Sequence, residues 1–246
     1  MNKIVVLMKT HVWNDDIEKF AIKIYDETQP NGIDFFILMH TENDELYKKI
    51  NTNYIKDIVL KFTEQEIKKI YSVGFFTMWL SNHWILMWFY KQFGKKYEYF
   101  WSMEYDVRIS GDSSKIWKYP SRYDFLYTMG NYRNSRNKYR KYYIGGKLSE
   151  LDKFYGYLQL ARYSNNALEY LDKCYEEGEN GQDELITYSL LIRGKLTGSK
   201  KFLRNLISGT WTWQSTYSDY NRKIYNQIEN SHDHDKNNVR IFHPIK

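Results

Sequence analysis

Short apolar runs alternate with amphipathic stretches along the first half of the chain. The runs at residues 4–7 (IVVL) and 34–39 (DFFILM) have few polar positions, which is typical of strands buried on both faces of a parallel sheet. Between them, apolar residues recur at helical spacing over residues 17–24, and Asn14 or Asp15 can cap that helix. This order of strand, helix and strand predicts a βαβ unit.

The same alternation continues beyond this unit. A third strand is predicted at residues 55–62, and residues 63–66 (TEQE) have the capping-box spacing that opens a helix. An aromatic helix over residues 84–93 leads to a hydrophobic strand at 97–103, and a fifth strand is predicted at 124–129.

Helical periodicity returns in the second half of the chain, at residues 165–176 and 183–195, whereas residues 199–225 are aromatic and poorly periodic. Residues 226–238 are polar and charged, which predicts a mobile surface loop. An apolar, strand-like patch follows at residues 239–246.

With 246 residues, the chain can bury one substantial core but not two typical catalytic domains. We therefore predict an α/β fold, with a single Rossmann-like domain over residues 1–246 and a mainly parallel central sheet flanked by helices. Residues 1–130 would form a nucleotide-binding half, and residues 131–246 an acceptor-binding half with a C-terminal tail.

The composition, with 42% hydrophobic and 27% charged residues, is that of a globular protein rather than a disordered or collagenous one. A net charge of +6 and a pI near 9.0 favour an anionic partner, which could be nucleic acid, a membrane surface or a diphosphate-bearing small molecule. The basic run at residues 133–141 could track phosphates, but a solvated loop is the favoured interpretation.

The single cysteine, Cys174, excludes an intramolecular disulfide and a multi-cysteine metal site, and it favours a reducing compartment. The apolar stretch at residues 73–93 is interrupted by Ser81, Asn82 and His83, so a membrane span is not expected. We therefore expect a soluble, cytoplasmic protein. The 24 Tyr and 8 Trp could stack on sugar rings or bases, although core filling is the commoner role of such residues.

Two acidic residues, Glu104 and Asp106, directly follow the strand predicted at residues 97–103. Residues two apart on a chain leaving a strand point to the same side, so both carboxylates can face one divalent cation, and Mg²⁺ or Mn²⁺ suits such oxygen ligands. The alternative is a structural ion pair with Arg108 or a nearby lysine. A second acid-x-acid triplet, Asp233 to Asp235, lies in a hydrophilic stretch with no strand to position it.

Residues 97–117 (YEYFWSMEYDVRISGDSSKIW) resemble the metal-site segment of GT-A fold glycosyltransferases, in particular an uncharacterised group with an aromatic strand, Glu-x-Asp-Val and then Ser-Gly. Residues 159–164 (QLARYS) resemble that group's Arg-x-Ser segment, and residues 242–246 (FHPIK) resemble its terminal His-Pro-x-Lys. The resemblance implies a GT-A-like fold, a requirement for Mn²⁺ or Mg²⁺, and a nucleotide-sugar donor, with a UDP-sugar favoured over a GDP-sugar.

The same resemblance implies roles for individual residues. Asp106 would bind the metal directly, and His243 would complete the metal or phosphate site. Glu104 stands where the commoner motif has Asp, so its longer side chain could reach either the ion or a ribose hydroxyl. Lys246 could contact the diphosphate as a cation.

An inverting sugar transfer needs a base that takes the proton of the acceptor hydroxyl, commonly a carboxylate near a helix start. Asp183 and Glu184 open the helix predicted at residues 183–195, and we favour Glu184 because the resembled segment has Glu before a Thr-containing helix, here Thr187. Both acids could equally be ordinary first-turn residues favoured by the helix dipole.

Polar residues also follow the first two predicted strands, where a nucleotide would lie in an open α/β sheet. Thr10 and His11 follow the first strand, and His40 and Thr41 follow the second. These four residues are therefore candidates for contacts with the base and ribose of the donor.

These observations favour a metal-dependent glycosyltransferase of the hexosyltransferase class, acting on a glycan or protein-linked glycan, with no nucleic-acid partner. Two alternatives remain: a basic nucleic-acid-binding protein, and another nucleotide-dependent metal enzyme on a doubly wound sheet. The sequence contains no P-loop motif, which weakens the second alternative.

Overall fold

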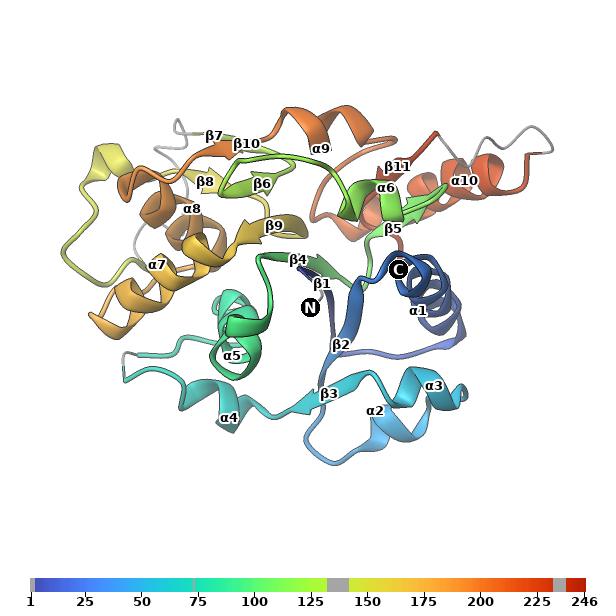
Figure 1. The fold of residues 1–246 in the computed structure, drawn as a ribbon, viewed down its shortest axis with the longest axis horizontal. Helices are drawn as coiled ribbons and strands as arrows, with labels where there is room; N and C mark the ends of the chain where they lie inside the picture. Colours follow the sequence, from blue (N-terminus) through green and yellow to red (C-terminus); the bar gives the residue numbers. More distant parts are fainter. Residues whose placement is uncertain (1–2, 73, 132–141, 232–237) are drawn as a thin grey trace.

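The computed structural model describes residues 3–72, 74–131, 142–231 and 238–246. Its centre is a seven-stranded sheet in the order β10-β6-β9-β4-β1-β2-β3, with helices on both faces (Figure 1). The strands of this sheet are β1 (Ile4–Thr10), β2 (Asp34–His40), β3 (Val59–Phe62), β4 (Tyr99–Glu104), β6 (Phe125–Tyr127), β9 (Leu160–Ser164) and β10 (Gly198–Ser199).

Two small two-stranded sheets lie outside the central one. They pair β5 (Arg108–Ser110) with β11 (Arg240–Phe242), and β7 (Gly130–Asn131) with β8 (Tyr155–Gly156). The helices are α1 (Asp15–Thr28), α2 (Glu45–Lys48), α3 (Asn53–Lys56), α4 (Glu64–Lys68), α5 (His83–Phe93), α6 (Ser114–Trp117), α7 (Asn165–Glu176), α8 (Asp183–Arg193), α9 (Lys201–Leu206) and α10 (Ser218–Glu229). Within the described ranges, no helix combines the length and apolarity that a membrane crossing requires.

The central sheet is mainly parallel, as the sequence predicts. β1 runs parallel to both β2 and β4, and β2 runs parallel to β3, whereas β9 is antiparallel to its neighbours β4 and β6. The carboxyl ends of β1, β2 and β4 therefore meet at one edge of the sheet, where loops are free to build a ligand site.

Alternation of side chains along β1 divides the core into two layers. Val5 and Leu7 belong to the hydrophobic cluster that includes α5, α7 and α8, while Val6 and Met8 belong to the cluster that includes α1. Figure 1 shows these two groups of helices on opposite sides of the sheet. The same alternation directs Lys9, the next residue, to the side of α5 and α8.

Most predicted elements are confirmed, including the Asn14 cap of α1 and the Thr63–Glu66 capping box of α4. The start of the predicted third strand is wrong, because residues 53–56 form α3 and β3 begins only at Val59. The Glu18 carboxylate accepts backbone N–H groups of Asn51 and Thr52, the latter at 2.7 Å, which anchors the chain just before α3.

Two further differences concern the second half of the chain. Residues 160–164, singled out only through the resemblance, form β9 in the middle of the sheet. The loop predicted at residues 226–238 begins too early, because helix α10 continues to Glu229 and its apolar side packs Tyr225 against Phe242 at 5.6 Å between ring centroids.

Candidate active site

A pocket of about 470 Å³ opens at the carboxyl edge of β1, β2 and β4. This volume lies in the range of cavities that hold small-molecule ligands. Its walls come from the ends of these strands, the start of α5, the start of α8 and the C-terminal segment: Lys9, Thr10, His11, His40, Met78, Trp79, Asn82, Ile85, Glu104, Tyr105, Asp106, Tyr155, Gln159, Gln182, Asp183, Glu184, Trp213, His243 and Lys246.

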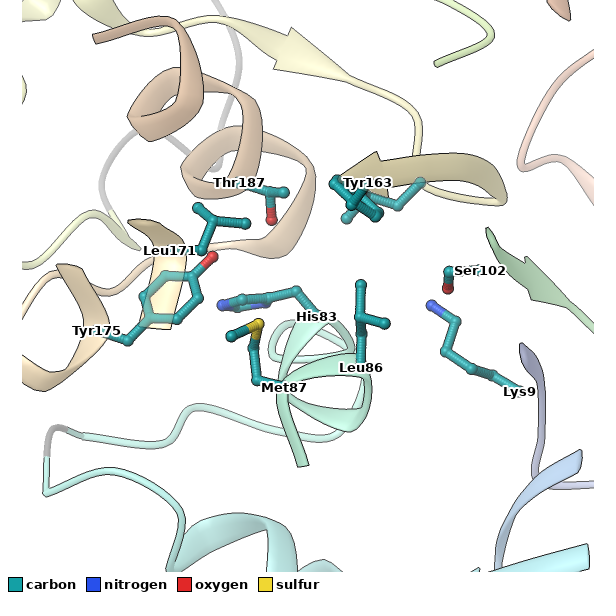
Figure 2. A pocket seen from close by; sticks show the side chains of 10 residues that line it. Lys9, His83, Leu86, Met87, Ser102, Tyr163, Leu171, Tyr175 and Thr187 are labelled. Carbon is teal, nitrogen blue, oxygen red and sulfur yellow. The ribbon is translucent and has the colours of Figure 1, made fainter. Parts of the chain in front are cut away.

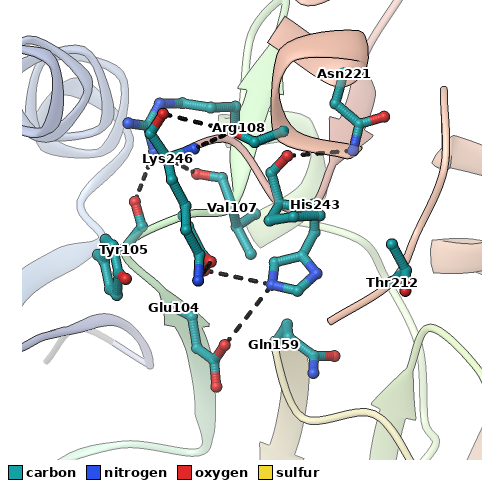
Figure 3. Close-up of polar contacts among 12 residues, drawn as sticks. Glu104, Tyr105, Val107, Arg108, Gln159, Thr212, Asn221, His243 and Lys246 are labelled. Carbon is teal, nitrogen blue, oxygen red and sulfur yellow. Dashed lines mark hydrogen bonds and ion pairs between the residues drawn. The ribbon is translucent and has the colours of Figure 1, made fainter. Parts of the chain in front are cut away.

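Three side chains form a compact cluster in this pocket. The Nε2 atom of His243 lies 3.3 Å from Oδ1 of Asp106 and 3.8 Å from Oε2 of Glu104. One donor atom from each of the three residues lies within 4.8 Å of the other two. Figure 3 shows the imidazole turned toward Glu104. The structure therefore brings together the three residues that the sequence suggested as metal ligands.

Backbone pairing holds the two parts of this cluster together. β4 ends at Glu104, and after a turn β5 pairs with β11, so that Arg108 lies opposite Phe242. Just beyond β11, the Ile245 N–H donates to the Asp106 carbonyl at 2.8 Å. These pairings place His243 and Lys246 beside Asp106, and the Lys246 ammonium lies 3.7 Å from Oδ2 of Asp106.

Arg108, the alternative partner of the acidic pair, is engaged elsewhere. Its guanidinium donates to the Asp16 carboxylate at 2.7 Å and to the carbonyls of Tyr105 and Val107 at 2.6 and 3.0 Å. Arg108 therefore forms no ion pair with Glu104 or Asp106, whereas the lysine alternative has a counterpart in the contact of Lys246 with Asp106. The contacts to two carbonyls hold the turn that carries Asp106.

The two carboxylates of the cluster respond differently to their surroundings. Burial acts to raise the pKa of Asp106, but the nearby imidazole of His243 and the charge of Lys246 outweigh burial, so this pKa is lowered. Burial raises the pKa of Glu104, and Asp106 adds to the effect, while Lys9 opposes it. Asp106 is thus the carboxylate that is held ionised.

The surroundings of Asp106 also suit a cation. Its Oδ1 is buried, and although Nε2 of His243 lies 3.3 Å away, the two atoms are not aligned for a hydrogen bond. An ionised oxygen removed from water without a hydrogen bond is costly unless a positive charge faces it. The donor set of two carboxylates and one imidazole therefore fits a divalent cation.

Asp183 and Glu184 lie at the start of α8 and occupy different positions. Oδ1 of Asp183 accepts the Glu184 N–H at 2.7 Å and a side-chain N–H of Gln182, the N-cap of α8, at 2.6 Å, so this carboxylate is bonded within the helix start. Glu184 accepts hydrogen bonds from the Tyr155 hydroxyl and from the Gln159 amide, the latter at 3.0 Å.

Burial raises the pKa of both acids at the start of α8. For Glu184, the hydrogen bonds from Tyr155 and Gln159 oppose burial, and the pKa is raised to about 7. For Asp183, burial and the neighbouring charge of Glu184 raise the pKa well above its ordinary value. Glu184 is therefore the acid that can exchange a proton near neutral pH.

Lys9 is a site residue that the sequence did not reveal. It is 5% exposed, lines the pocket, and lies opposite Glu104 in the parallel pairing of β1 with β4. Burial lowers its pKa, although the charges of Glu104, Asp183 and Glu184 act in the opposite direction. The signal for it in the sequence is a lysine at the end of an apolar run, a position where a polar residue is also common without any function.

Behind the pocket, Lys9 also lines a second, much smaller cavity of about 10 Å³. Figure 2 shows Lys9 and Ser102 on one side of this cavity, and His83 with Tyr175 on the other. A cavity of this size is at the lower limit of what can hold one water molecule. The charged pocket and this small internal cavity therefore share one side chain.

Three of the four predicted nucleotide contacts, Thr10, His11 and His40, line the pocket. Burial lowers the pKa of His11, and the positive charge of His40 adds to this effect. Thr41 lies beneath the wall instead: it is 8% exposed, and its backbone N–H donates to the Phe62 carbonyl at 3.0 Å. Its backbone belongs to the junction of β2 and β3, and the residue does not line the pocket.

Asn82 was noted in the sequence only as an interruption of an apolar stretch. Its side-chain amide donates to Oε1 of Glu104 at 3.0 Å, which fixes one face of that carboxylate. Two predicted features, the basic run at residues 133–141 and the acidic triplet at residues 233–235, lie outside the residues that the structure describes.

No protein-family model matches this sequence, and no curated protein matches it. Among solved structures, the chain is similar to a glycosyltransferase involved in the glycosylation of the major capsid of PBCV-1, with 12% identity, a TM-score of 0.34, and coverage of 70% of this chain and 64% of that chain. It is also similar to the glycosyltransferase GlyE of Streptococcus pneumoniae TIGR4, with 12% identity, a TM-score of 0.42, and coverage of 93% and 51%.

A third similar structure is the inositol-1-phosphate CTP transferase from T. maritima, with 10% identity, a TM-score of 0.44, and coverage of 81% of this chain and 85% of that chain. The chain thus spans less than two thirds of the length of the two glycosyltransferases. These similarities are remote, and the proposed function rests on the residues of the pocket.

Proposed function

We propose that this protein is a metal-dependent glycosyltransferase, of the hexosyltransferase class, that moves a sugar from a nucleoside-diphosphate sugar to a hydroxyl group of a free or protein-linked glycan. The main support is a single pocket that contains both a carboxylate–imidazole cluster and Glu184. Such a transfer needs a cationic site for the diphosphate and a group that accepts the proton of the hydroxyl.

Glu104, Asp106 and His243 are the proposed ligands of a divalent cation. Mn²⁺ fits this set of two carboxylates and one imidazole well, because first-row transition ions accept nitrogen as well as oxygen ligands, and Mg²⁺ is the alternative. The ion, when bound, would supply positive charge against the negative charge that develops on the diphosphate.

The proposed donor lies along the ends of β1 and β2, with Thr10, His11 and His40 near its base and ribose. A UDP-sugar is the first donor to test, and a GDP-sugar is the second. Lys246, already within 3.7 Å of Asp106, is the proposed cation for the diphosphate. The assignment of residues 1–130 to the nucleotide and of residues 131–246 to the acceptor stays a prediction.

Glu184 is the proposed base. In an inverting transfer, its carboxylate takes the proton of the acceptor hydroxyl while the hydroxyl oxygen forms a bond to the anomeric carbon. The bond between that carbon and the diphosphate oxygen breaks, and the nucleoside diphosphate leaves with the electron pair. A pKa of about 7 suits this role, because an effective base has a pKa near the operating pH.

The test is incubation of the protein with UDP-sugars and GDP-sugars, with and without Mn²⁺ or Mg²⁺, followed by detection of free nucleoside diphosphate. We expect release that requires the cation and is lost in Asp106→Asn, with Mn²⁺ binding weakened by about a hundredfold or more in a calorimetric titration. Asp57→Asn, an exposed aspartate outside the pocket, is the matched control and should behave as the parent protein. Unchanged cation binding in Asp106→Asn would remove the basis of the proposal.

A further inference from the structure

Two tryptophans stand at the pocket with most of their surface in solvent. Trp79 and Trp213 both line it, and each is 66% exposed. Single exposed aromatic residues are common on protein surfaces. Here, however, two large indoles come from segments far apart in the sequence and lie at the same pocket. Such a concentration of apolar surface around a polar cavity is typical of a ligand site.

Trp79 is tied to the wall that carries the proposed base. The next residue, Leu80, accepts the Asp183 N–H on its carbonyl at 2.9 Å, at the first turn of α8. Asn82, three residues after Trp79, donates to Glu104 at 3.0 Å. The segment that carries Trp79 therefore contacts both the helix start with Glu184 and the proposed metal cluster.

Trp213 is tied to the wall that carries His243. The N–H of Thr212, the preceding residue, donates to the His243 carbonyl at 3.2 Å. Trp211 packs its ring against the His243 imidazole, with 5.4 Å between ring centroids. The indole of Trp213 thus extends into solvent from a backbone that is held at the proposed metal cluster.

We propose that Trp79 and Trp213 form the acceptor subsite and recognise a pyranose ring through its apolar C–H face. This assignment rests on the proposed function, because a hydroxyl attacking the donor must lie near Glu184, and Trp79 belongs to that wall. Indoles suit a pyranose, since the flat ring contacts C–H groups while the hydroxyl groups stay available to water and to polar side chains. The residues proposed to contact the donor's base are different ones, at the ends of β1 and β2.

The test uses Trp79→Ala, Trp213→Ala and the conservative Trp79→Phe, with Tyr220→Ala as a control. Tyr220 lies on α10, is 55% exposed and does not line the pocket. The probes are methyl pyranosides of glucose, galactose, mannose, N-acetylglucosamine, xylose and rhamnose, with their di- and trisaccharides. Binding is followed by saturation-transfer NMR, and transfer by release of nucleoside diphosphate.

We expect at least one probe to bind and to accept sugar, and each alanine variant to raise its KM by roughly tenfold, the loss expected for one stacking partner. Trp79→Phe should restore most of the affinity, and Tyr220→Ala should change nothing. In Tyr220→Ala the donor KM and the slow release of nucleoside diphosphate without acceptor should stay within about twofold of the parent values, and in the two alanine variants of the tryptophans the loss should appear in the acceptor KM rather than in the donor KM.

Three outcomes overturn the inference: no probe binds the parent protein, probe binding is the same in both alanine variants, or the alanine variants raise the donor KM instead. The proposed function is tested separately by donor cleavage in the parent protein. Suppose that no donor is cleaved, but that a probe binds the parent protein and this binding is lost in both alanine variants. The sugar-binding site is then supported, and the glycosyltransferase proposal fails.

Discussion

Two histidines, His83 and His243, are almost fully buried, with 5% and 3% of their surface exposed, yet their surroundings differ in kind. His83 lies beside the small internal cavity, and among the described residues neither of its ring nitrogens finds a hydrogen-bond partner (Figure 2). Its nearest aromatic neighbour is Tyr175, at 5.1 Å between ring centroids. His243 faces the carboxylates of Glu104 and Asp106.

The pKa of His83 follows from its position. Burial lowers this pKa to about 3, and the positive charge of Lys9 adds to the effect, so His83 stays neutral at ordinary pH. Burial without an opposite charge beside it therefore keeps His83 neutral. What distinguishes the proposed site is burial combined with opposite charge and with a pocket of ligand size, and each of the following predictions tests one part of that difference.

The largest expected effect concerns Glu184. Glu184→Gln should keep donor and cation binding but lose about a hundred- to ten-thousandfold in transfer rate, because the amide preserves shape and cannot accept the proton. Losing a helix-dipole contact would cost far less. Steady-state kinetics measure this difference. The control is Glu169→Gln, at an exposed position of α7.

Two other results would redirect the assignment. A fast Glu184→Gln variant beside a slow Asp183→Asn variant would make Asp183 the base. If neither substitution slows transfer, the start of α8 is structural, and a retaining mechanism without a base in this segment becomes the better account.

His243→Asn should weaken Mn²⁺ binding by about ten- to a hundredfold, because it removes the one nitrogen donor of the cluster and leaves both carboxylates. Calorimetric titration with MnCl₂ measures this loss directly, without any need for activity. His83→Asn is the matched control, since it makes the same change at a buried histidine outside the cluster. Equal losses in the two variants would mean that the effect comes from disturbed packing.

His83→Leu should reduce the sensitivity of the fold to acid. The unfolded chain takes up a proton on this histidine below about pH 6.5, whereas the folded protein does not until about pH 3. Lowering the pH through this window therefore destabilises the folded state, by about 2 kcal/mol at pH 5 for this residue, or roughly thirtyfold in the folding constant. Urea unfolding at pH 7 and pH 5 measures the change, and an equal loss of stability in the parent and the variant would contradict the neutral, buried state of His83.

The smallest expected effect is on the pH profile. Transfer should rise with pH as Glu184 loses its proton, reaching half its maximum near pH 7, so that the rate at pH 6 is about a tenth of the plateau. Lys9→Met should move this profile to higher pH, because it removes a positive charge that favours the ionised carboxylate. Lys49→Met, at an exposed position, is the control. If Lys9→Met does not shift the pH profile, Lys9 does not influence the ionisation of Glu184.

Local signals were sufficient to predict β1, β2 and the helix starts, because apolar runs and capping residues act over a few positions. The beginning of the third strand was predicted wrongly because the conformation of this segment depends on a distant residue. Glu18 accepts a hydrogen bond from the backbone just before α3. β9 was not predicted as a strand because Arg162 interrupts its apolar pattern. In the fold, this arginine donates to three backbone carbonyls in the loop before β6 and stacks over Tyr99 at 4.5 Å.

For the candidate site, too, some residues could be predicted from local sequence and others could not. Glu104 and Asp106 could be selected because they end a strand, and the structure places them in the pocket with Glu184. His243 entered only through the resemblance, because nothing local in the sequence connects it with residues 104–106. Lys9 and the two exposed tryptophans were not selected, because exposure and facing direction depend on how segments pack together.

The pairing of β5 with β11 joins two parts of the chain that are separated by more than half of its length. Contacts between such distant segments form late, since a long loop must close before they stabilise the structure. The proposed cation site cannot exist until this closure has occurred, because Glu104 and Asp106 lie on one side of it and His243 on the other. The rate at which Mn²⁺ binding recovers after dilution from denaturant would therefore report the rate at which β5 and β11 come together. A partly synthesised polypeptide lacking β11 would be unable to bind the ion at this site.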